Sequence, residues 1–204
     1  MNVQHNKLAA IILAAGSGKR IAELGPKPLL RVNGKTFVEI CYTCVEQVGC
    51  SPIVIVTNQK LSAELKRFAF KARLVINHKP EQGMISSIWC GMAVLPADVS
   101  GFFLVPIDFP LVKLSTFEKM KQTHQQYSDA IIRPQYNHKT GHPVIFSASF
   151  FDDLRMASLN EGAKSVVQKH HHLCKDVAVD DSGILININS VDMYNATCKR
   201  STQS

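Results

Sequence analysis

Residues 8–20 read LAAIILAAGSGKR and place a continuous apolar run, Leu8–Leu13, directly before a turn of small residues. A run of this length that ends at a glycine turn is typical of a strand buried on both faces of a parallel sheet. Backbone N–H groups of such a turn can approach phosphate oxygens closely, and glycine permits that approach. The stretch therefore predicts a buried strand followed by a phosphate-binding turn.

The rest of the chain alternates apolar runs with helical patterns. We predict further strands at 52–57, 74–76, 101–105, 130–134, 142–146, 177–179 and 184–188, helices near 36–48, 62–69, 86–94, 115–127, 150–157 and 162–170, and a hairpin or loop over 135–141. This order predicts an α/β fold: a three-layer α/β/α sandwich around a mostly parallel, doubly wound sheet. With 204 residues, we expect one domain with a core of about 8–194 and short flexible termini.

Composition narrows the classes of partner. The 23 Lys and Arg outnumber the 16 Asp and Glu, giving a formal net charge of +7, but the basic residues are scattered. A polyphosphate ligand explains this excess as well as nucleic acid does, and we expect no nucleic-acid partner. The longest apolar runs are too short to cross a bilayer, so we expect no membrane partner either. The sequence does not predict the oligomeric state.

The six cysteines lack the dense spacing of a small secreted protein, so we expect reduced thiols and a cytoplasmic location. Cys41 and Cys44 have the C-x-x-C spacing, but they lie in the apolar-periodic stretch Phe37–Val48. Packing in the core is favoured there over a redox or zinc role. His170, His171 and His172 are interpreted as a solvated helix end, since consecutive residues diverge around a helix.

Several polar residues follow the predicted strands. Lys19, Arg20 and Lys27 can neutralise a triphosphate, Arg through a bidentate fork and Lys as a point charge. The glycine spacing fits neither a P-loop nor a dinucleotide-binding loop. Asp108 comes just past a strand, at the edge where open α/β sheets bind ligands, and one carboxylate suffices to begin a magnesium site. A turn or helix-capping role is the alternative for Asp108.

Four motifs together resemble one enzyme family. They are LAAGSGKR at 13–20 with PKPLL at 26–30, GMISS at 83–87, DFPLV at 108–112 and GHPVIF at 141–146. This combination closely resembles the molybdenum cofactor cytidylyltransferase-like nucleotidyltransferases, a family of glycosyltransferase-A-like NTP transferases. The resemblance implies the fold of nucleotide-diphospho-sugar transferases and covers nearly the whole chain.

The resemblance also implies roles for individual residues. Arg20, Lys27 and Asp108 would be catalytic, Asp108 and Asn189 would bind Mg²⁺, and His142 and Asn160 would contact the acceptor. The nucleotide would be bound by Leu13, Ala14, Ala15, Gly16, Ser17, Gly18, Lys27, Gly83, Ser86 and Ser87. Two of these side chains have simpler alternatives: a lone His before a strand is more often structural, and Ser86 or Ser87 alone suits a helix cap.

The reaction that the resemblance implies is transfer of a nucleoside monophosphate from a nucleoside triphosphate to a phosphorylated acceptor. The Leu-Ala-Ala-Gly form favours CTP over GTP, and molybdopterin is the leading acceptor, with a sugar phosphate or another phosphorylated small molecule as the alternative. The chain departs from the family at Asn187 and Asn189, where related enzymes commonly have acids. An amide oxygen can still ligate magnesium but brings no negative charge. A catalytically weakened nucleotide-binding protein of the same fold is therefore a further alternative.

Overall fold

A computed structural model of the chain describes residues 7–16 and 18–201. Its centre is strand β1 (Lys7–Leu13), in which every residue except Lys7 is buried. β1 pairs in parallel with β4 (Ile53–Thr57) on one side and with β6 (Val99–Pro106) on the other. A strand enclosed by neighbours and covered on both faces must be apolar throughout, which is why this run lacks the alternation of a surface strand.

The main sheet has the strand order β10-β7-β9-β6-β1-β4-β5, and β8 pairs with β7 beside this path. The outer members are β5 (Arg73–Ile76), β7 (Ile131–Tyr136), β9 (Val144–Ser147) and β10 (Cys174–Ala178). β9 runs antiparallel to β6 and β7, whereas β1, β4, β5 and β6 are mutually parallel and β10 is parallel to β7. The predicted mostly parallel sheet is confirmed. The predicted hairpin is also present, because β8 (Lys139–Thr140) folds back antiparallel onto β7.

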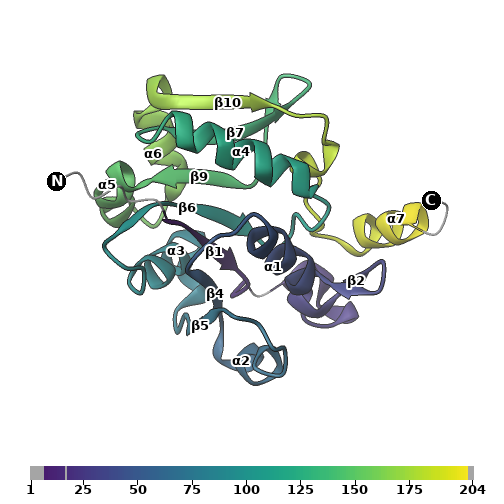
Figure 1. The fold of residues 1–204 in the computed structure, drawn as a ribbon. Helices are drawn as coiled ribbons and strands as arrows, with labels where there is room; N and C mark the ends of the chain where they lie inside the picture. The colour runs from purple at the N-terminus through teal and green to yellow at the C-terminus, as the bar shows by residue number, and fades with distance from the viewer. Residues whose placement is uncertain (1–6, 17, 202–204) are drawn as a thin grey trace.

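Successive side chains of β1 enter two different cores. Ala10 and Ile12 pack with helices α1 (Phe37–Gln47) and α4 (Leu114–Gln126), and Ile11 packs on the opposite face. That second face is covered by α3 (Met84–Met92), α5 (Phe151–Met156) and α6 (Ala163–Lys169) (Figure 1). The predicted three-layer α/β/α arrangement is therefore confirmed. Cys41 lies in the α1 core and Cys44 packs against it.

Local signals set the helix starts. Thr36 and Glu39 form a capping box at the start of α1, with the Glu39 N–H donating to Thr36 Oγ1 and the Thr36 N–H donating to Glu39 Oε2. Helix α2 (Gln59–Leu65) begins three residues before the predicted start, because the side chain of Asn58 accepts the Leu61 N–H and caps it. Helix α3 begins at Met84 after Gly83, so Ser86 and Ser87 lie inside its first turn and the predicted serine cap is wrong.

The predicted strand over 184–188 is wrong. These residues form the 3₁₀ turn η6 (Ser182–Leu185) and an extended segment without strand pairing. The carboxylate of Asp181 holds the turn, since Oδ1 accepts the Gly183 N–H while Oδ2 accepts from the Lys113 N–H and Thr116 Oγ1. The segment thus crosses the end of the sheet instead of extending it. A helix that we did not predict, α7 (Val191–Ser201), follows.

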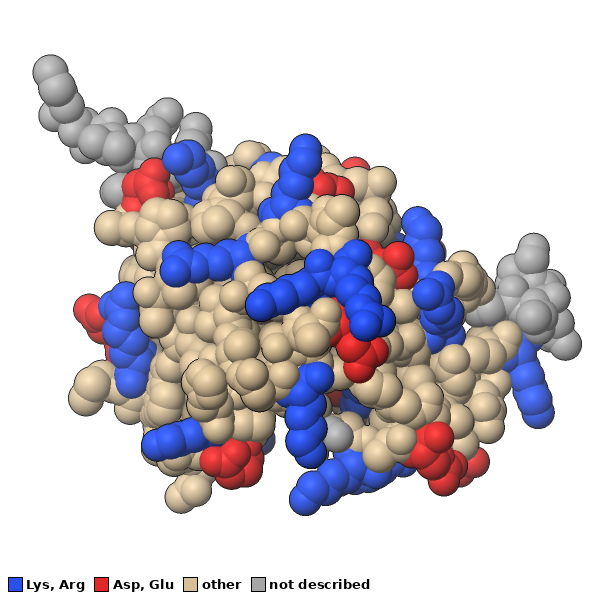
Figure 2. Space-filling model, turned by 90° about the horizontal axis from the view of Figure 1, so that it is seen from below, with Lys and Arg blue, Asp and Glu red and all other residues tan. Residues whose placement is uncertain are grey.

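The remaining elements are short. They are the strand pair β2 (Arg31–Val32) and β3 (Lys35–Thr36) and the 3₁₀ turns η1 (Lys19–Leu24), η2 (Lys27–Leu29), η3 (Pro80–Gln82), η4 (Ala148–Phe150) and η5 (His171–Leu173). Across the described residues, every helix is too short or too polar to span a bilayer. Lys and Arg are distributed over the face seen from below, with acidic residues among them (Figure 2). His171 and His172 are exposed just beyond α6, as expected for a solvated helix end. For His170 that expectation is wrong, because its side chain is only 19% exposed and its Nε2 lies 2.8 Å from Asp153 Oδ2.

The contact between α3 and β1 yields a stability prediction. A Cβ at Gly91 would lie 2.6 Å from Cγ2 of Ile11 and 3.2 Å from Cγ2 of Val56. We expect Gly91→Ala to lower the free energy of unfolding by about 1–2 kcal/mol, because overpacking outweighs the gain in helix propensity. Urea denaturation measures it. Ala93→Ser, at the exposed end of the same helix, is the control and should change stability by less than about 0.5 kcal/mol. Equal stability of the two variants would mean that Gly91 and Ile11 are not packed as closely as described.

Candidate functional site

The turn after β1 is held from the neighbouring strand. The Ala14 N–H donates to the Val56 carbonyl at 2.7 Å, and Asn58 Nδ2 donates to the Ala15 carbonyl at 3.1 Å. Gly18 has φ +56°, the left-handed conformation that glycine adopts without strain, and it starts η1. Ser17, which we predicted to bind nucleotide, lies outside the described residues. The backbone at Ala15 and Gly16 is thereby presented at the carboxyl edge of the sheet.

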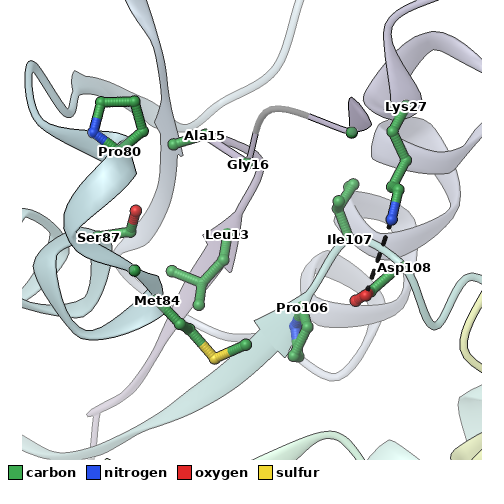
Figure 3. A pocket seen from close by; sticks show the side chains of 12 residues that line it. Leu13, Ala15, Gly16, Lys27, Pro80, Met84, Ser87, Pro106, Ile107 and Asp108 are labelled. Carbon is green, nitrogen blue, oxygen red and sulfur yellow. Dashed lines mark ion pairs between the residues drawn. The ribbon is translucent and has the colours of Figure 1, made fainter. Parts of the chain in front are cut away.

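A cavity of about 270 Å³ opens at this edge. Figure 3 shows Ser87 and Met84 of α3 on one side of the end of β1 and Lys27 and Asp108 on the other. Its lining contains eight of the predicted residues, namely Leu13, Ala15, Gly16, Gly18, Lys27, Gly83, Ser87 and Asp108, together with Pro80, Met84, Pro106 and Ile107. Residues from four separated parts of the sequence therefore face one volume.

Asn77 organises the wall that α3 contributes. Its buried Nδ2 donates to Ser86 Oγ and to Ser87 Oγ, both at 2.9 Å. Ser86 Oγ donates in turn to the Gly83 carbonyl at 2.8 Å and is buried, so Ser86 braces the turn and does not line the cavity. Ser87 does line it. Of the two predicted serines, the structure therefore places one against a ligand volume.

Three predicted residues meet on the opposite wall. Lys27 Nζ donates to Asn189 Oδ1 and lies 3.9 Å from Asp108 Oδ2. The Lys27 and Asp108 side chains are only 11% and 18% exposed, so the pair is largely shielded from water. Asn189 reaches this place because the Ile188 N–H donates to the Asp108 carbonyl at 2.8 Å. The segment over 184–188, which was predicted to be a strand, thus brings Asn189 next to Lys27.

Two glycines allow the segment that carries Asn189 to lie close to the rest of the chain at the sheet end. A Cβ at Gly141 would lie 2.1 Å from the Ile184 carbonyl oxygen, and one at Gly183 would lie 2.2 Å from the Leu111 carbonyl oxygen. Both obstacles are backbone atoms that cannot rotate away. The approach is secured by the His142 N–H, which donates to the Ile184 carbonyl at 3.0 Å. Glycine at these two positions is therefore a condition for bringing Asn189 beside Asp108.

Burial sets the protonation behaviour of the site. Burial lowers the pKa of Lys27, while the charge of Asp108 raises it and that of Arg20 lowers it. Burial also lowers the pKa of His142, and Asp108 partly opposes this. His142 Nδ1 is buried without a hydrogen-bond partner among the described residues, and its ring centroid lies 4.8 Å from that of Phe109. Burial of the His142 ring therefore favours its neutral form.

A second cavity, of about 630 Å³, adjoins the first at Met84, which lines both. His142 lines it, together with the cationic side chains Arg133 and Lys164 and an apolar set that includes Leu104 and Phe146. Asn160, our other predicted acceptor residue, is exposed and does not line this cavity, although its neighbours Glu161 and Gly162 do. This cavity combines apolar surface with positive charge.

A third cavity, of about 540 Å³, lies on the other side of the glycine turn. It shares Ala15, Gly16, Lys27 and Pro80 with the first cavity and adds polar groups from the ends of two more strands, including Asn58 and Asn77. We did not predict these two asparagines. Each directly follows a parallel strand, so the rule that ligands bind beyond carboxyl ends is the signal that points to them.

Ala14 and Arg20 do not line the first cavity either, and Asn189 reaches it only through its contact with Lys27. Ala14 is fully buried, with its side chain in the α1 core, and only its backbone belongs to the turn. Arg20 is exposed on η1 and acts on Lys27 through its charge. The structure thus brings together Lys27, Asp108 and Asn189 directly.

The donor set suits a divalent metal ion. The positively charged ammonium of Lys27 contacts one amide oxygen, of Asn189, and one carboxylate oxygen, of Asp108. Such hard oxygen donors are the ligands that Mg²⁺ and Mn²⁺ prefer, and Mg²⁺ commonly completes its shell with phosphate oxygens and water. Asp108 and Asn189 would hold such an ion.

Comparisons with known proteins give a family match and sequence relatives. A family model, described as the MobA-like NTP transferase domain, matches residues 10–173. The chain is 31% identical over 150 residues to nicotine blue oxidoreductase of Paenarthrobacter nicotinovorans, covering 69% of this chain and 71% of that protein. It is 27% identical over 129 residues to the bifunctional protein GlmU of Syntrophotalea carbinolica, covering 63% of this chain but only 28% of that longer protein.

Solved structures share the fold. Rv0371c of Mycobacterium tuberculosis superposes with a TM-score of 0.82 at 21% identity, covering 95% of this chain and 98% of that one, and it has also been solved in complex with manganese. The molybdopterin-guanine dinucleotide biosynthesis protein A of Archaeoglobus fulgidus superposes with a TM-score of 0.68 at 19% identity, covering 97% and 100% of the two chains. The fold expected from the sequence resemblance is therefore confirmed.

The close approach at Gly141 yields a test of how Asn189 is held. In Gly141→Ala the new Cβ must push the Ile184 carbonyl away. We expect the opening free energy of the Ile188 N–H, which donates to Asp108, to fall by about 1–3 kcal/mol. Amide hydrogen exchange at Ile188 measures it. Lys139→Ala, on the exposed hairpin strand β8, is the control. Unchanged protection of the Ile188 amide in Gly141→Ala would show that the segment is held independently of this contact.

Proposed function

Because the chain belongs to the MobA-like NTP transferase domain family, we propose that it transfers the nucleoside monophosphate of a nucleoside triphosphate to a phosphorylated acceptor and releases pyrophosphate. The observation that carries this proposal is the meeting of Lys27, Asp108 and Asn189 beside the glycine turn that ends β1. A cation, a carboxylate and the backbone of a glycine turn at one sheet edge suit a triphosphate and a metal ion.

We assign the nucleotide to the connected cavities around the turn. The backbone of Ala15, Gly16 and Gly18 would face the triphosphate, and Lys27 would bind it as a point charge. Arg20 is proposed to reach the phosphates from the exposed turn η1. Gly83 and Ser87, which line the opposite wall, would face the ribose and base. CTP is our preferred nucleotide, since the turn has the Ala15 form that resembles cytidylyltransferases.

The acceptor is assigned to the cavity of about 630 Å³ that meets the first at Met84. Its cation Lys164 suits a phosphate, and its apolar lining suits an organic ring system. The other cation of the lining, Arg133, is already paired with Asp176 through Nε and Nη2. We propose molybdopterin, which fits this chemistry and accords with the name of the structurally similar Archaeoglobus protein. Because Asn160 is exposed outside the lining, its proposed contact is limited to the rim.

The proposed step is an in-line displacement at phosphorus. An oxygen of the acceptor phosphate forms a bond to the α-phosphorus while the bond to the bridging oxygen breaks, and its electron pair leaves with pyrophosphate. A phosphate monoester is anionic near neutral pH, so no side chain has to remove a proton. Lys27 and Arg20 would orient the phosphates and offset their charge, so the chain contributes mainly positioning and electrostatics. Mg²⁺ held by Asp108 and Asn189 would stabilise charge on the transferring phosphate.

A second candidate is a nucleotide-binding protein of the same fold with weakened turnover. One observation favours it: residue 189 is an asparagine, where the family that the sequence resembles commonly has an acid. Pyrophosphate release, measured with CTP, GTP and ATP against molybdopterin and a panel of sugar phosphates, separates the candidates. Tight nucleotide binding without consumption of any acceptor would establish the second candidate and overturn the first.

The carboxylate of Asp108 provides the sharpest activity prediction. Asp108→Asn should lower metal-dependent pyrophosphate release by at least about 10²-fold, because it removes the charged metal ligand while keeping its shape. Thermal denaturation should show a retained fold. Asp98→Asn, which removes a surface carboxylate paired with Lys7, is the matched control and should keep full activity. Wild-type turnover in Asp108→Asn would remove Asp108 from the reaction.

Asn189→Asp tests the departure from the family. A second carboxylate would raise the negative charge offered to the metal, so we expect half-maximal activity at a metal concentration lowered by about tenfold. Titration of turnover with Mg²⁺ measures this. The same concentration for both proteins would mean that the amide at position 189 does not limit metal binding.

A further inference from the structure

Lys27 stands where the proposed metal ion would bind. Its Nζ donates to Asn189 Oδ1 and lies 3.9 Å from Asp108 Oδ2, and these are the two oxygens that we assign to Mg²⁺. The Lys27 side chain is only 11% exposed, so little of it is in contact with water. One pair of oxygens therefore has two potential cationic occupants.

The charge of the cluster is already balanced. Asp108 contributes one negative charge, Lys27 one positive charge and the Asn189 amide none, so the three formal charges cancel. A divalent cation that approached with Lys27 in place would meet a like charge within a few ångströms and no net negative charge to attract it. The asparagine at position 189 is decisive here, because an aspartate would leave one negative charge uncompensated.

The Lys27 side chain also has space into which its ammonium can move. It lines both cavities that flank the glycine turn, of about 270 Å³ and 540 Å³, so the space that we assign to the triphosphate begins at the same side chain. The backbone of Lys27 starts the turn η2 between Pro26 and Pro28. Since proline restricts the backbone on both sides, the movable part is the four-carbon side chain with its rotatable ammonium.

We propose that Lys27 is a built-in counter-cation that occupies the Asp108 and Asn189 oxygens while the protein is free of nucleotide. The triphosphate draws the ammonium away and brings its own negative charge, so the divalent cation binds together with the nucleotide and not before it. This inference rests on the proposed function for its choice of ligand. Metal and nucleotide are then positively coupled, and each raises the affinity for the other by the same factor.

Mn²⁺ binding to the nucleotide-free protein tests this directly, with the electron paramagnetic resonance signal of free Mn²⁺ as the readout. We expect weak binding by the wild type and at least about tenfold tighter binding by Lys27→Gln, because the competing cation is gone. Lys27→Met is a second uncharged variant in case one fails to fold, which circular dichroism detects. Lys66→Gln, at an exposed position on the surface, is the matched control for loss of one positive charge and should bind like the wild type.

The coupling is tested in the wild type with non-hydrolysable α,β-methylene CTP. We expect the analogue to tighten Mn²⁺ binding by about tenfold or more, and by a smaller factor in Lys27→Gln. Equal Mn²⁺ affinity of the wild type and both folded Lys27 variants, or equal affinity with and without the analogue, would overturn the inference. The free-protein measurement uses no acceptor and no turnover. Tighter Mn²⁺ binding by the Lys27 variants, together with no pyrophosphate release by the wild type, would therefore reject only the proposed function. Turnover by the wild type without tighter Mn²⁺ binding by the variants would reject only the inference.

Discussion

The parallel pairing of β1 with β4 and β6 is the constraint on which the rest of the structure depends. Three strands that run in one direction deliver their carboxyl ends to one edge, and the residues that follow them must meet there. The glycine turn follows β1, Asn58 follows β4, and Asp108 comes two residues after β6. The proposed triphosphate site is thus a consequence of strand direction. The two hydrophobic cores, one on each face of β1, hold the strands in this arrangement.

The other half of the site comes from a segment that belongs to no strand. Residues 182–189 cross the sheet end, held by the Asp181 carboxylate and admitted by Gly141 and Gly183. This crossing places a neutral amide against Asp108 and Lys27. The charge balance of the site is therefore set by a residue more than eighty positions away from Asp108 along the chain. In the inference drawn above, a neutral group there links occupancy by metal to the arrival of a polyphosphate.

The prediction of the strands succeeded where an apolar run pairs with neighbouring strands and failed where an apolar run only covers the core. The run Leu8–Leu13 and the β-branched run in β4 are buried strands, as their continuous apolar character indicates. The segment over 184–188 has the same apolar character, yet its backbone pairs with no strand. Ile184 and Ile188 are apolar because they cover the core at the sheet end. Burial and strand pairing produce similar sequences, and hydrophobicity alone does not separate them.

The sequence by itself determined the alternation of elements, the order of the motifs and therefore which residues lie at the carboxyl edge, because these depend on local propensity and strand direction. Only the tertiary structure decided which of them face one cavity. Ser87 lines the cavity, whereas the Ser86 hydroxyl donates to the Gly83 carbonyl. The Lys27 ammonium contacts both Asp108 and Asn189. Such contacts depend on side-chain packing between segments distant in sequence, and on two glycines whose close approach is to backbone atoms far along the chain.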